Sequence, residues 1–166
     1  MRMFAFALLS VLFFTPTAKG QEQKFFTQMW CDEGLTGYLQ AVVWPPGLYE
    51  FEIIADGDVT QCRGEMPLKS CEQSVICDRE TVRIGVYGCN KDQDLHAFST
   101  LSLFRIPETL TLKIKQQQGW TASSTIRIEN KQCGYPNGEQ CDDRICCSAS
   151  ASIPVEWDYP KDGAGE

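Results

Sequence analysis

Nine cysteines behind a short apolar leader constrain this chain more than any other feature of its sequence. Residues 1–20 hold an early Arg2, an apolar run over 4–14, and small residues at Ala18 and Gly20, which is the pattern of a cleaved secretory signal peptide. The apolar run is shorter than the roughly 20 residues that a membrane anchor needs. We therefore predict export to an oxidising compartment, where closely spaced thiols form disulfides. The cysteines are Cys31, Cys62, Cys71, Cys77, Cys89, Cys133, Cys141, Cys146 and Cys147.

The acidic composition of the chain disfavours some classes of binding partner. The leader holds Arg2 and Lys19 and no acid, so 15 basic side chains less these two leave 13 against 22 acidic ones, a formal charge of about −9. Nucleic acid is disfavoured as a partner because its affinity depends on Lys and Arg, and an anionic membrane surface is disfavoured for the same reason. Residues 21–166 are predicted to form a single secreted domain with short disordered ends at 21–27 and 159–166. No Asn-x-Ser/Thr sequon occurs, so N-glycosylation is not expected.

The chain after the leader alternates apolar and polar residues with the period of β-strands. Strands with one buried face are predicted at 49–54, 81–87, 110–115 and 126–129, and further strands at 38–44, 98–106 and 147–157. Chain-reversing sequences such as Pro45-Pro46-Gly47 and Gln118-Gly119 separate them. Seven or eight short strands with regular turns predict an all-β fold, a single disulfide-stabilised antiparallel β-barrel or sandwich.

Two groups of cysteines fit a known pattern. Cys62 and Cys77 bracket a loop between the strands 49–54 and 81–87, and a cluster from Cys133 to Cys147 precedes a final strand rich in small residues. In spacing and strand order, residues 31–157 resemble the family of the major Alternaria allergen, small secreted fungal β-barrel proteins that include plant-infection effectors. Several cysteines are additional to that pattern: Cys71, Cys89, Cys141 and one of the adjacent pair. The chain is therefore either a diverged member of this family or an unrelated disulfide-rich β protein.

The resemblance implies a disulfide scheme. It pairs Cys62 with Cys77, pairs Cys133 with Cys146 or Cys147, and assigns Cys31 to a bridge between two subunits. Two further bridges are then expected among Cys71, Cys89, Cys141 and the other member of the adjacent pair.

Nine cysteines cannot all pair within one chain, and Cys31 lies outside every compact cluster, behind the N-terminal segment. We therefore predict a homodimer linked through Cys31, with Trp30 at a two-fold interface. A free, capped Cys31 thiol is the alternative.

No catalytic residue, metal or cofactor is predicted. A hydrolase built on the one histidine, His96, would need a nucleophile and an orienting acid within reach, so we interpret His96 as a surface-loop residue. The run 90–94 spaces oxygen ligands like the start of a calcium loop, but Leu95 and Leu101 occupy the positions of the required glycine and glutamate. Zinc is disfavoured because the adjacent Cys146-Cys147 is not a Cys-x-x-Cys knuckle.

One aromatic residue is a candidate binding contact. Most of the four tryptophans are expected in the core or at its rim, because aromatic side chains dominate burial in small β domains. Trp120 follows Gln116-Gln117-Gln118-Gly119 at a predicted hairpin tip. An exposed ring there would serve as a contact for a partner.

Together these features favour a secreted, non-enzymatic β protein that acts outside the cell by binding a host or extracellular partner. The resemblance implies an effector or allergen-type role in virulence. It also implies plant defence proteins of the thaumatin-like class, or small phenolic ligands, as partners. A structural extracellular or cell-wall protein without a discrete ligand is the alternative.

Overall fold

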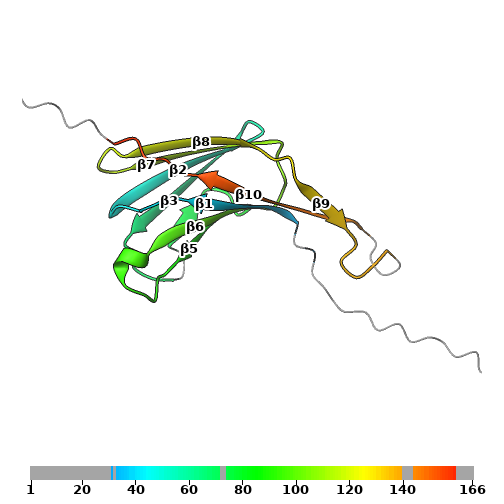
Figure 1. Ribbon diagram of the computed structural model, residues 1–166, viewed down its shortest axis with the longest axis horizontal. Helices are drawn as coiled ribbons and strands as arrows, with labels where there is room; N and C mark the ends of the chain where they lie inside the picture. The colour runs from blue at the N-terminus through cyan, green and yellow to red at the C-terminus, as the bar shows by residue number, and fades with distance from the viewer. Residues whose placement is uncertain (1–30, 32, 72–73, 140–143, 160–166) are drawn as a thin grey trace, which may run out of the picture.

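Ten strands form two packed five-stranded sheets (Figure 1). The computed structural model describes residues 31, 33–71, 74–139 and 144–159. Sheet A has the strand order β5-β6-β1-β10-β9 and sheet B the order β4-β3-β2-β7-β8. The elements are β1 (Gly34–Gln40), β2 (Gly47–Ala55), β3 (Asp58–Met66), β4 (Val75–Cys77), β5 (Val82–Tyr87), the 3-10 helix η1 (Gln93–Leu95), β6 (Ala97–Leu103), β7 (Thr109–Gln116), β8 (Thr121–Arg127), β9 (Lys131–Gly134) and β10 (Cys146–Pro154).

The prediction of an all-β fold is confirmed, and of its two alternatives the sandwich is correct and the closed barrel is wrong. Each sheet keeps two edge strands, β5 and β9 in sheet A and β4 and β8 in sheet B. The strand pairs are antiparallel as predicted with one exception, because β1 and β10 pair in parallel from Gly34 opposite Ser148 to Gln40 opposite Pro154. The first and last strands of the described chain therefore lie side by side within sheet A.

Alternating burial on facing strands produces the core. Along β2, Tyr49, Phe51 and Ile53 are buried, while the glutamates between them point toward water. The strands β7, β6 and β10 bury their own alternate residues against these side chains: Leu110, Leu112, Ile114, Leu101, Leu103, Ala149 and Ile153. Burial of apolar surface is the dominant stabilising contribution, at about 25 cal/mol per Å².

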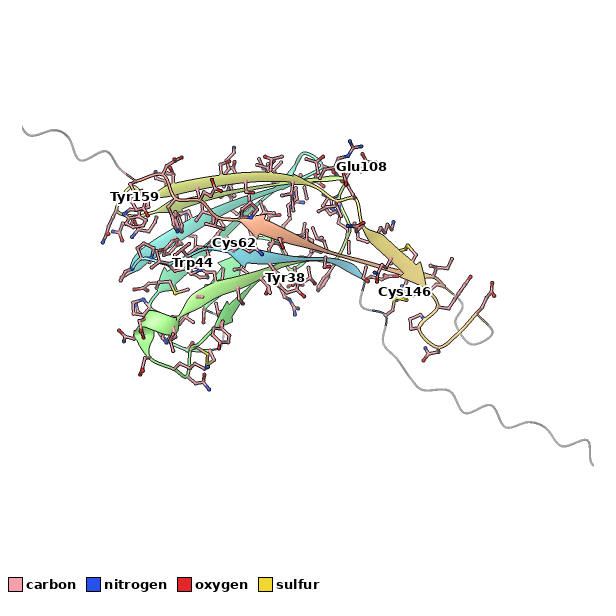
Figure 2. All side chains as sticks on the ribbon, viewed as in Figure 1. Tyr38, Trp44, Cys62, Glu108, Cys146 and Tyr159 are labelled. Atoms are coloured by element: carbon pink, nitrogen blue, oxygen red, sulfur yellow. A yellow bond between two sulfur atoms is a disulfide. The ribbon has the colours of Figure 1, made fainter. Side chains whose placement is uncertain are left out.

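Trp44, in the connection from β1 to β2, joins the two sheets at one end of the sandwich. Its ring centroid lies 5.6 Å from that of Tyr49 and 6.4 Å from that of Phe51, both in sheet B. It lies 4.9 Å from that of Phe98 in sheet A, and Trp157 packs against it at 5.4 Å. Figure 2 labels Trp44 at the end of the sandwich away from Cys146.

Four disulfides stabilise the described part of the chain. Two of them join directly opposed residues on neighbouring strands, Cys62 of β3 with Cys77 of β4, and Cys133 of β9 with Cys147 of β10. These are pairs that the resemblance implied. The other two are Cys71–Cys89 and Cys31–Cys146. Four disulfides in one small domain are typical of an extracellular protein.

The intermolecular role predicted for Cys31 is wrong. Its sulfur is bonded to that of Cys146, 115 residues later in the chain. The parallel pairing of β1 with β10 brings the starts of both strands together, so the two Cα atoms are 5.6 Å apart. The predicted homodimer thereby loses the cysteine on which it was based. Both members of the adjacent pair are occupied, Cys146 by Cys31 and Cys147 by Cys133.

Several predictions concern residues outside the described ranges. They are the signal peptide at 1–20, the segment 21–27, Trp30 and Cys141. Within the described ranges, no helix has the length and apolar character required to cross a bilayer.

Removal of the Cys62–Cys77 bridge tests the contribution of the disulfides. The bridge spans 15 residues, so replacing both cysteines by alanine is expected to lower the free energy of unfolding by about 3 kcal/mol. Replacing Cys31 and Cys146, which close a loop of 115 residues, should cost more, on the order of 4 to 5 kcal/mol. Urea unfolding followed by circular dichroism measures both losses. A larger loss for the shorter loop would contradict loop closure as the source of the stabilisation.

Candidate binding surface

The outer face of sheet B is a charged, solvated surface. Lys113 Nζ lies 2.7 Å from Glu52 Oε1, and Arg63 Nη2 lies 3.5 Å from Glu50 Oε1. The hydrogen bond from Lys113, and a further one from Gln61, hold the pKa of Glu52 below its usual value. Exposed ion pairs of this kind contribute little to stability.

The outer face of sheet A carries hydroxyl groups in place of these charges. Burial alternates along its strands, so alternate residues of β1, β6, β10 and β5 face outward. We define the hydroxyl face as Thr36, Tyr38, Gln40, Thr100, Ser102, Ser148, Ser150 and Ser152. No member is ionised at neutral pH. In the register of β6, Ser102 is followed on the edge strand β5 by the charged Arg83, whose guanidinium carbon lies 5.4 Å from the centroid of the Phe104 ring.

Strand register arranges the hydroxyl face in rows. Two of these rows, continued onto β5, are Arg83–Ser102–Thr36–Ser150 and Gly85–Thr100–Tyr38–Ser152. Neighbouring strands are about 4.8 Å apart, and side chains on one face repeat about every 7 Å along a strand. Gln40 closes the end of this grid, because its amide Nε2 donates to Ser152 Oγ at 3.1 Å. The result is a regular array of hydrogen-bonding groups.

Tyr38 is the one aromatic member of the hydroxyl face. It is 52% exposed and lies on β1 in the middle of sheet A (Figure 2). The other residues of its row, Gly85, Thr100 and Ser152, are small. At the β5 end of the row, a Cβ added to Gly85 would lie 2.2 Å from Thr100 Oγ1. Only glycine at this position lets the Thr100 side chain lie flat beside it. The neighbours of the Tyr38 ring in its row are therefore short, uncharged side chains.

Sequence reasoning missed this surface although part of its signal was visible. The final strand was predicted at 147–157, and in the structure its alternate residues Ala149 and Ile153 are buried. The serines between them were not considered as a group. Their relation to Thr36 and Tyr38 depends on the pairing of β1 with β10, which the local pattern does not contain.

Trp120 follows β7 at the turn into β8, where the sequence placed it, but its ring does not project freely. The ring is half-buried, with its centroid 4.6 Å from that of Tyr159 and 6.1 Å from that of Trp157. Trp157 is itself fixed, because its Nε1 donates to the Val43 carbonyl at 2.9 Å. The exposed ring at this end of the sandwich is Tyr159, at 63%. Trp120 as a binding contact stays a prediction.

His96 is a buried residue, so its interpretation as a surface-loop histidine is wrong. It is 8% exposed, and its Nδ1 accepts a hydrogen bond from the Leu68 amide at 2.9 Å. Since an amide can only donate, the ring proton is on Nε2, which donates to the Lys91 carbonyl at 3.2 Å. Both ring nitrogens are thus engaged in joining the segment after β3 to the segment before β6.

One trio of potential metal ligands occurs among the described residues, and it is not a metal site. Ligand atoms of Cys31, Glu33 and Cys146 lie within 4.8 Å of one another. The two sulfurs are bonded to each other, however, and Glu33 lies 3.6 Å from Arg144. A disulfide sulfur is not the thiolate that a metal ion requires.

No family model, curated protein or solved structure matches this chain. The likeness to the allergen family therefore remains a prediction from cysteine spacing and strand order. The geometry of the chain itself carries the functional argument.

Replacing His96 tests its structural role. His96→Phe keeps an aromatic ring but leaves the buried Leu68 amide without an acceptor, which is expected to lower the free energy of unfolding by about 1 to 3 kcal/mol. Urea unfolding measures the loss, and hydrogen exchange at the Leu68 amide should accelerate. Gln93→Ala in the neighbouring η1 is the control and should change neither quantity. An unchanged unfolding midpoint for His96→Phe would show that the hydrogen bond contributes nothing.

Proposed function

We propose that this protein is secreted and acts outside the cell, without catalysis, by binding an uncharged polysaccharide through the hydroxyl face. The observation that supports this proposal is the chemistry of the face. Rows of serine and threonine surround one exposed tyrosine, and no member of the face is charged.

Hydroxyl groups match hydroxyl groups. Each serine or threonine Oγ donates one hydrogen bond and accepts others, as does each hydroxyl of a neutral sugar. The ring of Tyr38 offers an apolar surface for the C–H face of a sugar ring, and its own hydroxyl remains free to bond. Binding to such a face desolvates no charge, which removes the largest cost of burying a polar surface.

A protein partner fits this face less well. The cores of protein interfaces are depleted in serine relative to the rest of the surface and enriched in large aromatic residues, methionine and arginine. The hydroxyl face has three serines on β10 alone, and Tyr38 is its one large apolar side chain. A neutral glycan is therefore favoured over the thaumatin-like class of defence protein that the resemblance implies.

The other parts of the proposal have separate support. Four disulfides and the predicted leader agree with secretion. Non-enzymatic action is supported by His96, whose two ring nitrogens are both engaged in structural hydrogen bonds. An effector or allergen-type role in virulence is the biological setting that the resemblance implies.

Removing the Tyr38 ring tests the proposal. Wild-type protein is expected to sediment with insoluble neutral polysaccharides, tested separately as cellulose, chitin and β-1,3-glucan, and Tyr38→Ala should weaken that binding about tenfold. Ser150→Glu places a charge and a longer side chain on β10, opposite Thr36, and should weaken polysaccharide binding as well. Tyr159→Ala is the matched control, because this tyrosine is also more than half exposed but lies beside Trp120, away from the hydroxyl face.

Binding isotherms separate the outcomes. Failure of the wild type to bind any of the three polysaccharides, or equal binding by Tyr38→Ala and wild type, would contradict the proposal. If the protein instead captured a basic host protein, and Tyr38→Ala abolished that capture, the hydroxyl face would still be a binding surface but its ligand would not be a glycan. Release by excess soluble oligosaccharide would distinguish a discrete ligand from permanent incorporation into a wall.

A further inference from the structure

A cavity of about 280 Å³ opens between the two sheets, at the end of the sandwich away from Trp44. Its walls include Ile53 and Ala55 of β2 and, from sheet A, Val82 and Leu103, all of them buried residues. No member of the hydroxyl face lines it, so this is a separate site. Its volume is just below the range for pockets that hold drug-sized ligands, roughly 300 to 1,000 Å³, so it suits a smaller molecule.

Thr60 is the polar residue within these apolar walls. It lies on the core face of β3 and is only 4% exposed. Its side chain lines the cavity, so its hydroxyl is the hydrogen-bonding group that the core face of β3 offers there. A hydroxyl can both donate and accept, so it can bond to a polar ligand atom that enters the cavity.

Two arginines lie at the mouth of the cavity. The Nη2 of Arg105 donates to the Ala55 carbonyl at 2.7 Å and to Asp58 Oδ2 at 2.8 Å, which fixes the guanidinium in place. Its other N–H groups remain available, because a guanidinium has five donors. Arg79 supplies a second guanidinium, which has no ion-pair partner in the described part of the chain. With Asp58 as the one acid of the lining, the mouth is net positive on a protein of formal charge −7.

We infer that this cavity binds a small monocarboxylate with a compact apolar body. The body fills the space between Ile53, Val82 and Leu103, where it displaces water from apolar walls. The carboxylate lies at the mouth, where Arg79 can bind it bidentately and the free donors of Arg105 can add to the contact. The hydroxyl of Thr60 bonds to a ligand oxygen that enters the cavity.

The probe for the test is 3-phenylpropionate, with 3-phenylpropanamide as its neutral counterpart. Titration of the full chain followed by amide chemical shifts should move the signals of Thr60, Leu103 and Phe104 and leave those of the hydroxyl face unchanged. The acid should bind about tenfold more tightly than the amide, because only the acid pairs with the arginines.

Two variants and one control complete the test. Arg79→Gln removes an exposed charge with no structural partner, so the fold should be kept while affinity for the acid falls about tenfold. Arg63→Gln makes the same charge change on the outer face of sheet B and should bind as wild type. Thr60→Val removes the hydroxyl and keeps a branched side chain, so the fold should be kept while affinity falls.

Three results would overturn the inference: equal affinity for the acid and the amide, wild-type affinity in Arg79→Gln, or no localised shifts at millimolar probe. Wild-type affinity in Thr60→Val would overturn the assigned contact to the hydroxyl. None of these results depends on Tyr38. The carboxylate site can therefore be disproved while the proposed glycan binding holds, and glycan binding can be disproved while the carboxylate site holds.

Discussion

The packing of Trp44 between the sheets is the contact on which the rest of the sandwich depends. The chain passes from sheet A to sheet B through the segment that carries this residue, and its ring meets Phe51 on one sheet and Phe98 on the other. Aromatic side chains of this size fill the space between facing sheets, which lie about 10 Å apart. This end of the molecule is therefore closed. The opposite end, where β2 finishes at Ala55, keeps the cavity that Arg79 and Arg105 border.

Sequence pattern was sufficient for strands whose inner face is uniformly apolar. The strands β2, β5 and β7 are of this kind, and each was predicted within a few residues of its observed bounds. Three strands were missed for physical reasons, and one of them, β4, has only three residues, too few for an alternating pattern to show. The inward residues of β3 include Thr60, Cys62 and Gly64, which do not read as an apolar face. The strand β9 is exposed on both faces, so its structure comes from pairing with β10 and from the Cys133–Cys147 bridge.

Side-chain surroundings were harder to predict than strands because they depend on distant partners. Nothing near His96 in the sequence shows that the Leu68 amide, 28 residues away, supplies a hydrogen bond to its ring. Likewise, a hairpin tip predicts an exposed Trp120, but the C-terminal segment returns and lays Tyr159 against it. The hydroxyl face is the same kind of case. Its residues come from strands far apart in sequence, and only the observed register puts Tyr38 beside Thr100 and Ser152.

The parallel pairing of β1 with β10 also has a consequence for how the protein must be made. During synthesis from the N-terminus, the β1 edge that later receives β10 stays open until residues 146–154 have been added. An open strand edge is a template for pairing with other chains, and contacts this distant in sequence form slowly. A nascent chain therefore carries an aggregation-prone edge over the interval between the two strands, residues 41–145.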